Sequence, residues 1–325
     1  MDFTRFKKTQ KKVLRLIENS YKKNRLVHAY LFEGAKGTPK IEGAYYLANL
    51  LMCRGENKPC GECLDCQRIL NGEHPRIFYI EPIQETIKKE QIEALEHEFS
   101  RVSLEEGVRV FIIKDIDKAT LSASNSILKF LEEMNENNYG ILITESLQNV
   151  LLTIRSRSQI VSFNKVTYED NVKEYTDKGI DLEVSNVLAK ITNNTDEGIE
   201  YIKEGKIIDI IDLVKKINRS IVLNENPYLK FYEASRFLFD DNNKKNHQMF
   251  MDLLILITND RIYKILGRDD EITFTNEIEN LVNDMEMDYQ KTFSQLEKII
   301  EFKGRMKYNL NLDLMYMQMF IEIMR

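Results

Sequence analysis

The segment that decides the fold is GAKGTPKI at residues 34–41, which follows an apolar run and opens a helical pattern. A phosphate loop has the pattern G-x-x-x-x-G-K-[S/T] and lies at this point between a strand and a helix. Gly34 and Lys40 match the pattern, whereas Pro39 stands at the second glycine and Ile41 at the hydroxyl position. The segment therefore predicts a strand–loop–helix unit of the phosphate-loop type whose loop is damaged.

Each departure from the pattern removes a part of ATP chemistry. Proline has no N–H for a phosphate oxygen and fixes φ near −65°, so Pro39 takes a donor from a loop that still contains Gly37. The aliphatic side chain of Ile41 cannot ligate magnesium. A later apolar run is followed by Lys114-Asp115, which puts a cation where the metal-holding acid is expected. We therefore expect residues 34–41 to be a silent nucleotide site without Mg-ATP hydrolysis.

Residues 27–163 alternate between short apolar runs and helical patterns with apolar residues three and four positions apart. The expected buried strands are Val27–Phe32, Ile77–Ile80, Val108–Ile113, Tyr139–Thr144 and Gln159–Phe163. Strands that alternate with helices predict a parallel sheet covered on both faces.

The strand signals end near Phe163, and helical patterns follow. We predict an α/β core at residues 1–164, a small set of short helices at 165–205 and an all-helical bundle at 206–325. Two apolar stripes are typical of the bundle, one formed by Phe250, Leu253, Leu254 and Ile257 and the other by Phe293, Leu296 and Ile300.

Composition and charge restrict the class of protein. The N-terminal residues have no apolar signal region, and no apolar run approaches the roughly 20 residues needed to span a bilayer, so we expect a cytosolic protein without a membrane partner. The net charge of −6 argues against a surface that binds nucleic acid everywhere. Residues 1–25 nevertheless carry nine Lys or Arg residues against Asp2 and Glu18. This basic first helix either lies along phosphates or is a solvated helix with its apolar side packed inward, and we favour the second interpretation.

All four cysteines of the chain lie within fourteen residues, at Cys53, Cys60, Cys63 and Cys66. Disulfides are disfavoured in the cytosol, whereas four thiolates at short spacing form a closed tetrahedral zinc site. The cluster therefore predicts a structural zinc ion in an insertion at residues 53–66. An iron–sulfur cluster and a reduced, metal-free cluster are the alternatives.

Several motifs together resemble one family. They are HAYLF at 28–32, NSILKFLEE at 125–133, ITE at 143–145 and TIRSR at 153–157, beside the damaged loop and the cysteine cluster. With these residues the chain resembles, over essentially its full length, the delta-prime family of bacterial DNA polymerase III clamp-loader subunits. The residues from Arg305 to Asn311 resemble the closing helices of that family.

The resemblance implies an AAA+ fold with a core, a small helical lid and a helical collar domain that holds a pentamer together. It implies no ATPase activity in this subunit. Ser156, Arg157 and Ser158 match the family's S-R-C motif, in which the arginine is offered in trans to the ATP of a neighbouring motor subunit. Ser158 replaces the cysteine, which is not the charge donor.

The implied partners are the delta and tau/gamma subunits and, through the complex, the sliding clamp and primer–template DNA in the cytoplasmic, nucleoid-associated replisome. The rival functions are an ATP-hydrolysing gamma/tau-type subunit, a P-loop kinase with a zinc lid and a free-standing zinc-knuckle nucleic-acid binder. The first two need an intact loop, and the third leaves the helical bundle unexplained.

Overall fold

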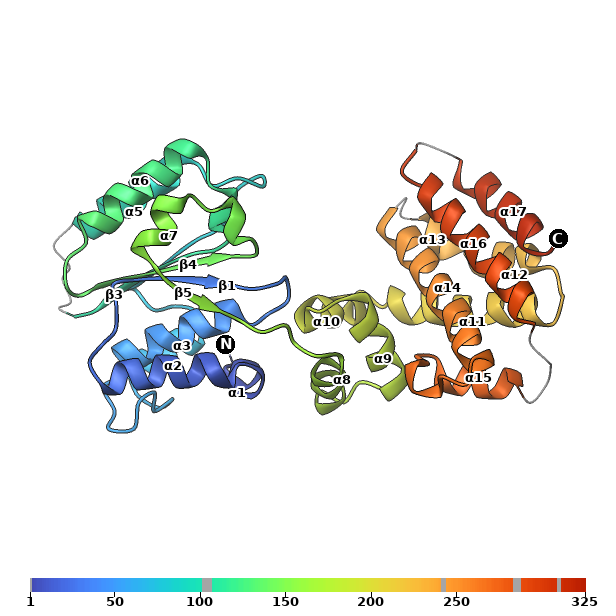
Figure 1. Cartoon of the computed structure of the whole chain (residues 1–325), viewed down its shortest axis with the longest axis horizontal. Helices are drawn as coiled ribbons and strands as arrows, with labels where there is room; N and C mark the ends of the chain where they lie inside the picture. The colour runs from blue at the N-terminus through green and yellow to red at the C-terminus, as the bar shows by residue number, and fades with distance from the viewer. Residues whose placement is uncertain (1, 101–106, 241–243, 283–287, 309–310) are drawn as a thin grey trace. The chain divides into compact units, whose positions relative to one another are not determined.

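The computed structural model describes residues 2–100, 107–240, 244–282, 288–308 and 311–325. The chain divides into two compact units, Met1–Thr167 and Tyr168–Arg325, which we call unit 1 and unit 2 (Figure 1). Unit 1 combines a sheet with helices and unit 2 is helical where described, which confirms the predicted combination of an α/β part with an all-α part.

The described part of unit 1 contains one parallel sheet with the order β2-β3-β4-β1-β5. The strands are β1 (Ala29–Glu33), β2 (Ile77–Ile80), β3 (Arg109–Ile113), β4 (Asn138–Thr144) and β5 (Gln159–Ser162). β1 lies between β4 and β5, with Tyr30 opposite Ile141 on one side and opposite Gln159 on the other. All five predicted strands are confirmed, and the damaged loop follows a central strand at the carboxyl edge of the sheet.

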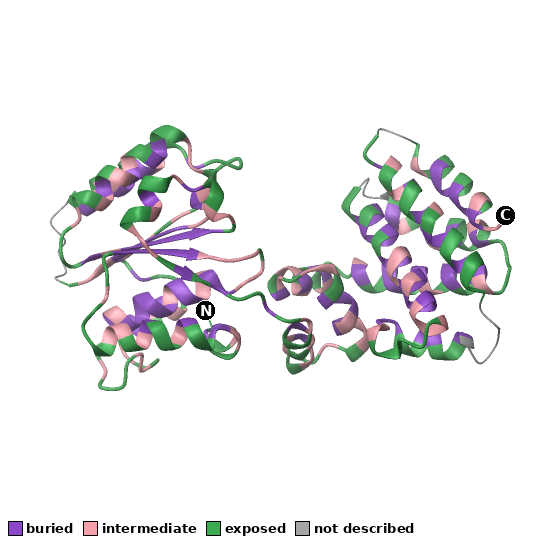
Figure 2. Ribbon diagram, viewed as in Figure 1, coloured by how far each residue is buried: buried purple, intermediate pink, exposed green. Residues whose placement is uncertain are grey.

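Alternating residues of the strands supply the two faces of the sheet with apolar side chains. Tyr30 and Phe32 of β1 pack in a cluster with the helices of the N-terminal third, whereas Leu31 packs in a second cluster with the later helices of unit 1. The two sets of helices lie on opposite faces, and the strands between them are largely buried (Figures 1 and 2). The prediction of a sheet covered on both faces is therefore confirmed.

The helices of unit 1 are α1 (Thr4–Thr9), α2 (Lys11–Lys22), α3 (Lys40–Met52), α4 (Leu64–Leu70), α5 (Lys89–Ser100), α6 (Leu121–Glu132) and α7 (Leu152–Arg157), with short 3₁₀ turns η1 (Ile116–Lys118) and η2 (Leu147–Asn149). The single basic first helix that we expected is wrong, because Gln10 separates α1 from α2. The Gln10 side chain is buried and exchanges two hydrogen bonds with the backbone of Asn164, which fixes the break. The expected inward packing of α2 is confirmed by buried Val13 and Ile17.

Unit 2 is built from helices around one large apolar cluster. They are α8 (Tyr168–Asp177), α9 (Leu182–Ile191), α10 (Thr195–Lys203), α11 (Lys206–Val222), α12 (Pro227–Ala234), α13 (Arg236–Asp240), α14 (Lys244–Ile265), α15 (Thr275–Val282), α16 (Tyr289–Arg305) and α17 (Leu312–Ile323), with a 3₁₀ turn η3 (Asp269–Glu271). Side chains of α8 to α10 join the same cluster as those of α11 to α17. The finer division into a lid at 165–205 and a collar at 206–325 stays a prediction.

One of the two predicted stripes of the bundle is not the buried face of its helix. The stripe on α14 is buried, but on α16 only Leu296 is, while Phe293 and Ile300 are exposed. Helix α16 instead buries Ile299 and Phe302 on the side of Leu296, together with the polar Thr292 and Gln295. Of the closing segment from Arg305 to Asn311, residues 309–310 lie outside the described residues. Within the described ranges, no helix combines the length and apolarity required to cross a bilayer.

Candidate functional site

The loop between β1 and α3 is filled by its own lysine. Lys40 is only 5% exposed, and its Nζ donates to the carbonyl oxygens of Gly34 at 2.6 Å and Ala35 at 2.9 Å. It also lies 3.2 Å from Oγ1 of Thr38, which itself donates to the Ala35 carbonyl. In a working phosphate loop this ammonium reaches the β- and γ-phosphates. Here it binds the oxygens of its own loop.

The charges around Lys40 are unfavourable for an anion. Four carboxylates act on it, those of Glu145, Asp115, Asp117 and Glu33. Burial lowers the pKa of Lys40, and these carboxylates oppose that shift. Asp117 also accepts a 2.7 Å hydrogen bond from Oγ1 of the buried Thr144, at the end of β4. A triphosphate entering here would meet carboxylates, while the one lysine of the motif already has partners.

The other positions that depart from the nucleotide-binding pattern, Pro39, Ile41 and Lys114, have contacts within the protein itself. Pro39 precedes α3 at φ −77°, and Ile41 packs against the apolar cluster of α1 to α3. Lys114 lies 3.4 Å from a carboxylate oxygen of the exposed Glu81. Gly37 has a φ of +82°. Neither the Ile41 side chain nor the Lys114 side chain has an oxygen that could bind magnesium.

Arg5 is a residue of the loop that the sequence analysis missed. It comes from α1, donates to the Gly37 carbonyl at 2.6 Å and lies 3.8 Å from Glu42 of α3. The guanidinium therefore ties the N-terminal helix to the tip of the loop. No loop motif contains such a residue, because the contact is thirty-two positions away in sequence.

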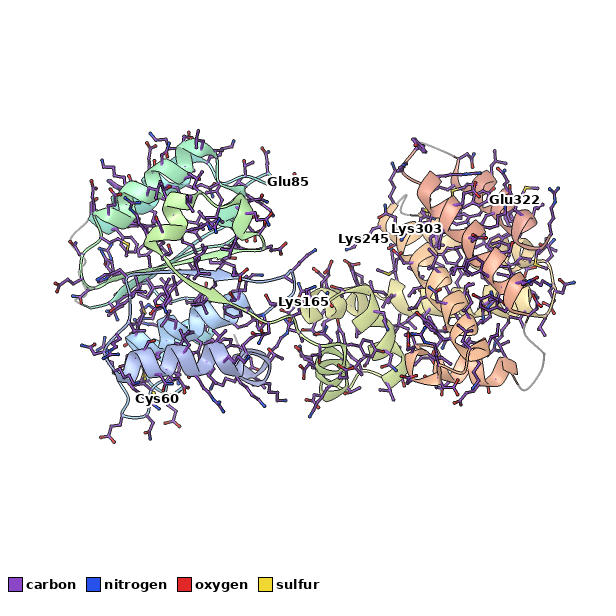
Figure 3. All side chains as sticks on the ribbon, in the orientation of Figure 1. Cys60, Glu85, Lys165, Lys245, Lys303 and Glu322 are labelled. Carbon is purple, nitrogen blue, oxygen red and sulfur yellow. The ribbon has the colours of Figure 1, made fainter. Side chains whose placement is uncertain are left out.

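The four cysteines come together as predicted. Cys53 ends α3, Cys63 caps α4, and the four Sγ atoms all lie within 4.8 Å of one another. The Sγ atoms of Cys53 and Cys60 are 3.5 Å apart, and those of Cys60 and Cys66 are 3.8 Å apart. A zinc ion with four ligands at about 2.3 Å separates them by about 3.8 Å in a tetrahedron, so the residues fit the ion. Figure 3 labels Cys60 in the loop between α3 and α4.

Backbone N–H groups donate to two of the sulfur atoms and stabilise their thiolate form. Gly55 and Cys60 donate to Sγ of Cys53 at 3.3 Å, and Cys63 donates to Sγ of Cys60 at 3.4 Å. Hydrogen bonds from the backbone of Cys63 and Glu62 lower the pKa of Cys60 to about 6. Burial raises the pKa of Cys66, which a coordinated cation would reverse.

An ionic network around the buried Asp65 lies beside the cysteines and was also missed. Asp65 of α4 is 2.7 Å from Arg54, 3.2 Å from His74 and 3.5 Å from Arg76. His74 Nδ1 accepts from the backbone N–H of Arg76, so its Nε2 carries the proton that faces Asp65. Although burial opposes it, the His74 hydrogen bond and the two arginines lower the pKa of Asp65. The network fastens the cysteine segment to the chain that leads into β2.

Arg157 lies where the sequence analysis expected, exposed at the end of α7 before the edge strand β5. Its guanidinium is 2.6 Å from a carboxylate oxygen of Glu132 at the end of α6, and both side chains are about half exposed. Ser156 donates to the Thr153 carbonyl, and Ser158 is partly buried. Glu132 belongs to the NSILKFLEE motif, but no pattern in the sequence indicates its contact with Arg157.

Comparison with known proteins places the chain in a family. The family described as "DNA polymerase III, delta subunit" matches residues 9–167. The DNA polymerase III subunit delta' of Bacillus subtilis is 32% identical over 306 residues, which cover 94% of this chain and 93% of that protein. The B. subtilis subunit tau is 29% identical over 160 residues, which cover 49% of this chain and 28% of tau. A solved DNA polymerase III gamma subunit-related protein of Thermotoga maritima is 17% identical with a TM-score of 0.47, covering 95% of this chain and 98% of that one.

The match to the B. subtilis delta' subunit extends through both units, whereas the match to tau covers about half of this chain. Near-complete coverage of both sequences at this identity shows common family membership. The chain therefore belongs to the delta-prime family of bacterial DNA polymerase III clamp-loader subunits.

Proposed function

We propose that this chain is a non-hydrolysing clamp-loader subunit of the delta-prime type. In this role it joins delta and tau/gamma subunits through a collar at 206–325, which follows a small helical lid at 165–205. The resulting complex belongs to the cytoplasmic, nucleoid-associated replisome and loads the sliding clamp onto primed DNA. It contributes no catalysis of its own to the polymerase holoenzyme. A zinc ion bound by the four cysteines has a structural role and holds the 53–66 segment together.

The observation that carries the proposal is the position of the Lys40 ammonium. Its two short hydrogen bonds to the Gly34 and Ala35 carbonyls occupy the group that an ATPase needs for the phosphates. Loss of magnesium ligands at Ile41 and Lys114 acts on the same chemistry. The ATP-hydrolysing alternative requires all three features to be reversed.

The active contribution that we propose is Arg157, offered in trans to the ATP of the neighbouring subunit. The Arg157 guanidinium and its partner Glu132 are both about half exposed, so their ion pair contributes little free energy. The guanidinium can therefore leave Glu132 for a phosphate at a small cost in free energy. A guanidinium placed at a γ-phosphate accelerates hydrolysis about 10³–10⁵-fold in systems that use one.

The test is ATP hydrolysis by the reconstituted complex, stimulated by clamp and primed DNA. Arg157→Ala should leave this chain folded and the complex assembled but slow hydrolysis at least about tenfold, and Arg157→Lys should rescue poorly because an ammonium lacks the planar fork. Arg155→Ala is a weaker control because part of its side chain is buried. Arg305→Ala is better matched, since Arg305 also ends a helix, is about as exposed and has a 2.6 Å ion pair.

Wild-type hydrolysis by the Arg157→Ala complex would refute the trans role. Magnesium-dependent hydrolysis by the pure chain would favour the gamma/tau-type subunit, and transfer of the γ-phosphate to an acceptor would favour a kinase. Failure of the chain to co-purify with replication subunits would favour an independent zinc-knuckle protein.

A further inference from the structure

The outer side of α1 and α2 presents a row of cations, which we call the basic face. Its members are exposed Lys or Arg side chains, namely Lys7, Lys8, Lys11, Lys12, Arg15, Lys22, Lys23 and Arg25. Residues 1–25 hold nine basic and two acidic residues, a net charge of +7 in a chain whose total is −6. The remaining 300 residues therefore carry −13, and positive charge is concentrated on this face.

The acidic residues nearby are already engaged. Glu18 lies on the same side of α2 as the row, where it accepts a 2.7 Å hydrogen bond from the Tyr46 hydroxyl. Asp2 accepts a 2.9 Å hydrogen bond from the backbone N–H of Thr4. The one basic residue of the segment that points inward is Arg5, at the Gly37 carbonyl. Among the described residues, no ion pair involves the six basic residues from α2 onward: Lys11, Lys12, Arg15, Lys22, Lys23 and Arg25.

The geometry of α2 aligns part of the row. At 3.6 residues per turn, Lys11, Arg15 and Lys22 fall within an arc of about 40° and extend over about 17 Å of helix. The cysteine segment adds one more cation, because the exposed Lys58 lies 5.8 Å over the ring of Tyr21. The opposite side of α2 is fixed by buried Val13 and Ile17, so the row is held in a defined orientation.

We propose that the basic face binds the phosphate backbone of duplex DNA, without reading its sequence. A duplex carries about one negative charge per 1.7 Å of its axis, so the length of α2 lies opposite a dense row of phosphates. Binders of unpaired strands add exposed aromatic rings on which bases stack. Within residues 2–25, which are all described, the aromatic side chains of Phe3 and Phe6 are buried and Tyr21 is partly buried. The face therefore offers charge without stacking, which favours a duplex over a single strand.

This proposal does not depend on the role of Arg157 or on the silent loop, since the isolated chain should show it. The experiment measures fluorescence anisotropy of a short labelled DNA duplex with the full chain over a range of salt concentrations. The triple variant Lys11→Gln/Arg15→Gln/Lys22→Gln should bind at least about tenfold more weakly at low salt. The slope of log K against log salt should become less negative by about 2.7, because each phosphate that is no longer neutralised changes it by about 0.9.

A matched control removes two lysines and one arginine elsewhere on the surface. Lys173→Gln/Lys203→Gln/Arg236→Gln replaces exposed helical residues of unit 2 with the same change in net charge. A conservative variant, Lys11→Arg/Lys22→Arg, keeps the charge and should bind as the wild type does. It also shows that substitution at these positions leaves α2 folded.

Three results would overturn the proposal. The first is an equal weakening of binding in the control variant, which would reduce the effect to net charge. The second is tighter binding to unpaired DNA than to the duplex. The third is binding to phosphatidylglycerol vesicles with no duplex binding, which would assign the face to a membrane surface.

Discussion

Removal of the Lys40 ammonium should destabilise the loop at residues 34–41 locally, and it should have no effect on nucleotide binding. In a working phosphate loop, replacing the lysine abolishes nucleotide binding, because the side chain reaches toward the phosphates. Here Lys40 is almost fully buried and donates to Gly34, Ala35 and Thr38. Lys40→Ala should therefore increase the amide exchange of residues 34–41, and the wild type should show no Mg-ATP binding that the substitution could remove.

The magnitude follows from the two short bonds to carbonyl oxygens. A hydrogen bond to a charged group contributes about 1.5–3 kcal/mol, so withdrawing the ammonium to meet a phosphate costs about 3–6 kcal/mol. That cost weakens nucleotide binding by about 10²–10⁴-fold relative to an open loop. Because Lys40→Ala also relieves the desolvation of the ammonium, we expect a smaller local loss of stability, about 1–3 kcal/mol.

Hydrogen exchange of peptides covering residues 34–41 and titration calorimetry with Mg-ATP test this explanation. Lys36→Ala is the control, because Lys36 is an exposed lysine of the same loop. Pro39→Gly alone should not restore binding, since Ile41 and Lys114 remain. Exchange that is no faster in Lys40→Ala than in Lys36→Ala would refute the reasoning, as would micromolar Mg-ATP binding that Lys40→Ala abolishes.

Three further predictions concern the metal cluster and buried carboxylates. Gly55→Ala should reduce bound zinc below one ion per chain by elemental analysis, because an added Cβ would lie 2.8 Å from Cβ and 2.9 Å from Sγ of Cys60. Asp65→Asn should lower the free energy of unfolding of unit 1 by about 2–4 kcal/mol in urea titrations, since it removes the carboxylate that faces the buried Arg76 and accepts the proton of His74. Burial raises the pKa of Asp260 from 3.8 to about 6, so the stability of unit 2 should decrease as the pH rises from about 4 through 6, and Asp260→Asn should remove that slope.

Each of these predictions has a control and a contrary result. Gly304→Ala tests the glycine change in an open place, because a Cβ there meets nothing within 4 Å. Asp252→Asn removes an exposed ion pair with Lys303 and should cost less than about 1 kcal/mol. Full zinc content in Gly55→Ala, equal costs for the two aspartate variants or an unchanged pH slope in Asp260→Asn would each contradict the corresponding argument.

The sheet could be predicted because its signal is local. The central strands β1, β3 and β4 are short apolar runs that are largely buried, and the edge strands β2 and β5 are short runs that are partly exposed. In each case the run itself contains the information. The cysteine cluster was predictable for the same reason, since four ligands within fourteen residues need little knowledge of the fold. The start of α3 after the loop likewise followed from the motif.

Contacts between distant segments could not be predicted in this way. The Gln10 side chain ends one helix and begins another because it meets Asn164, which is 154 positions away. On α16, Gln295 is buried beside Arg261, whereas Phe293 and Ile300 are exposed, so apolar spacing identified the helix but not its buried side. The spacing of apolar residues shows which side chains share a face of a helix, but the neighbouring helices decide which face is buried.

The loop shows how a local loss becomes a new structural role. Pro39 removes a backbone donor from the loop, whose Gly34 and Ala35 carbonyls here bind a cation. Lys40 supplies it at the cost of desolvation, and Arg5 supplies another at the Gly37 carbonyl. Both cations are bound to carbonyl oxygens of the loop, which thereby joins α1, β1 and α3. These contacts give the lysine of the motif a structural role that needs no nucleotide.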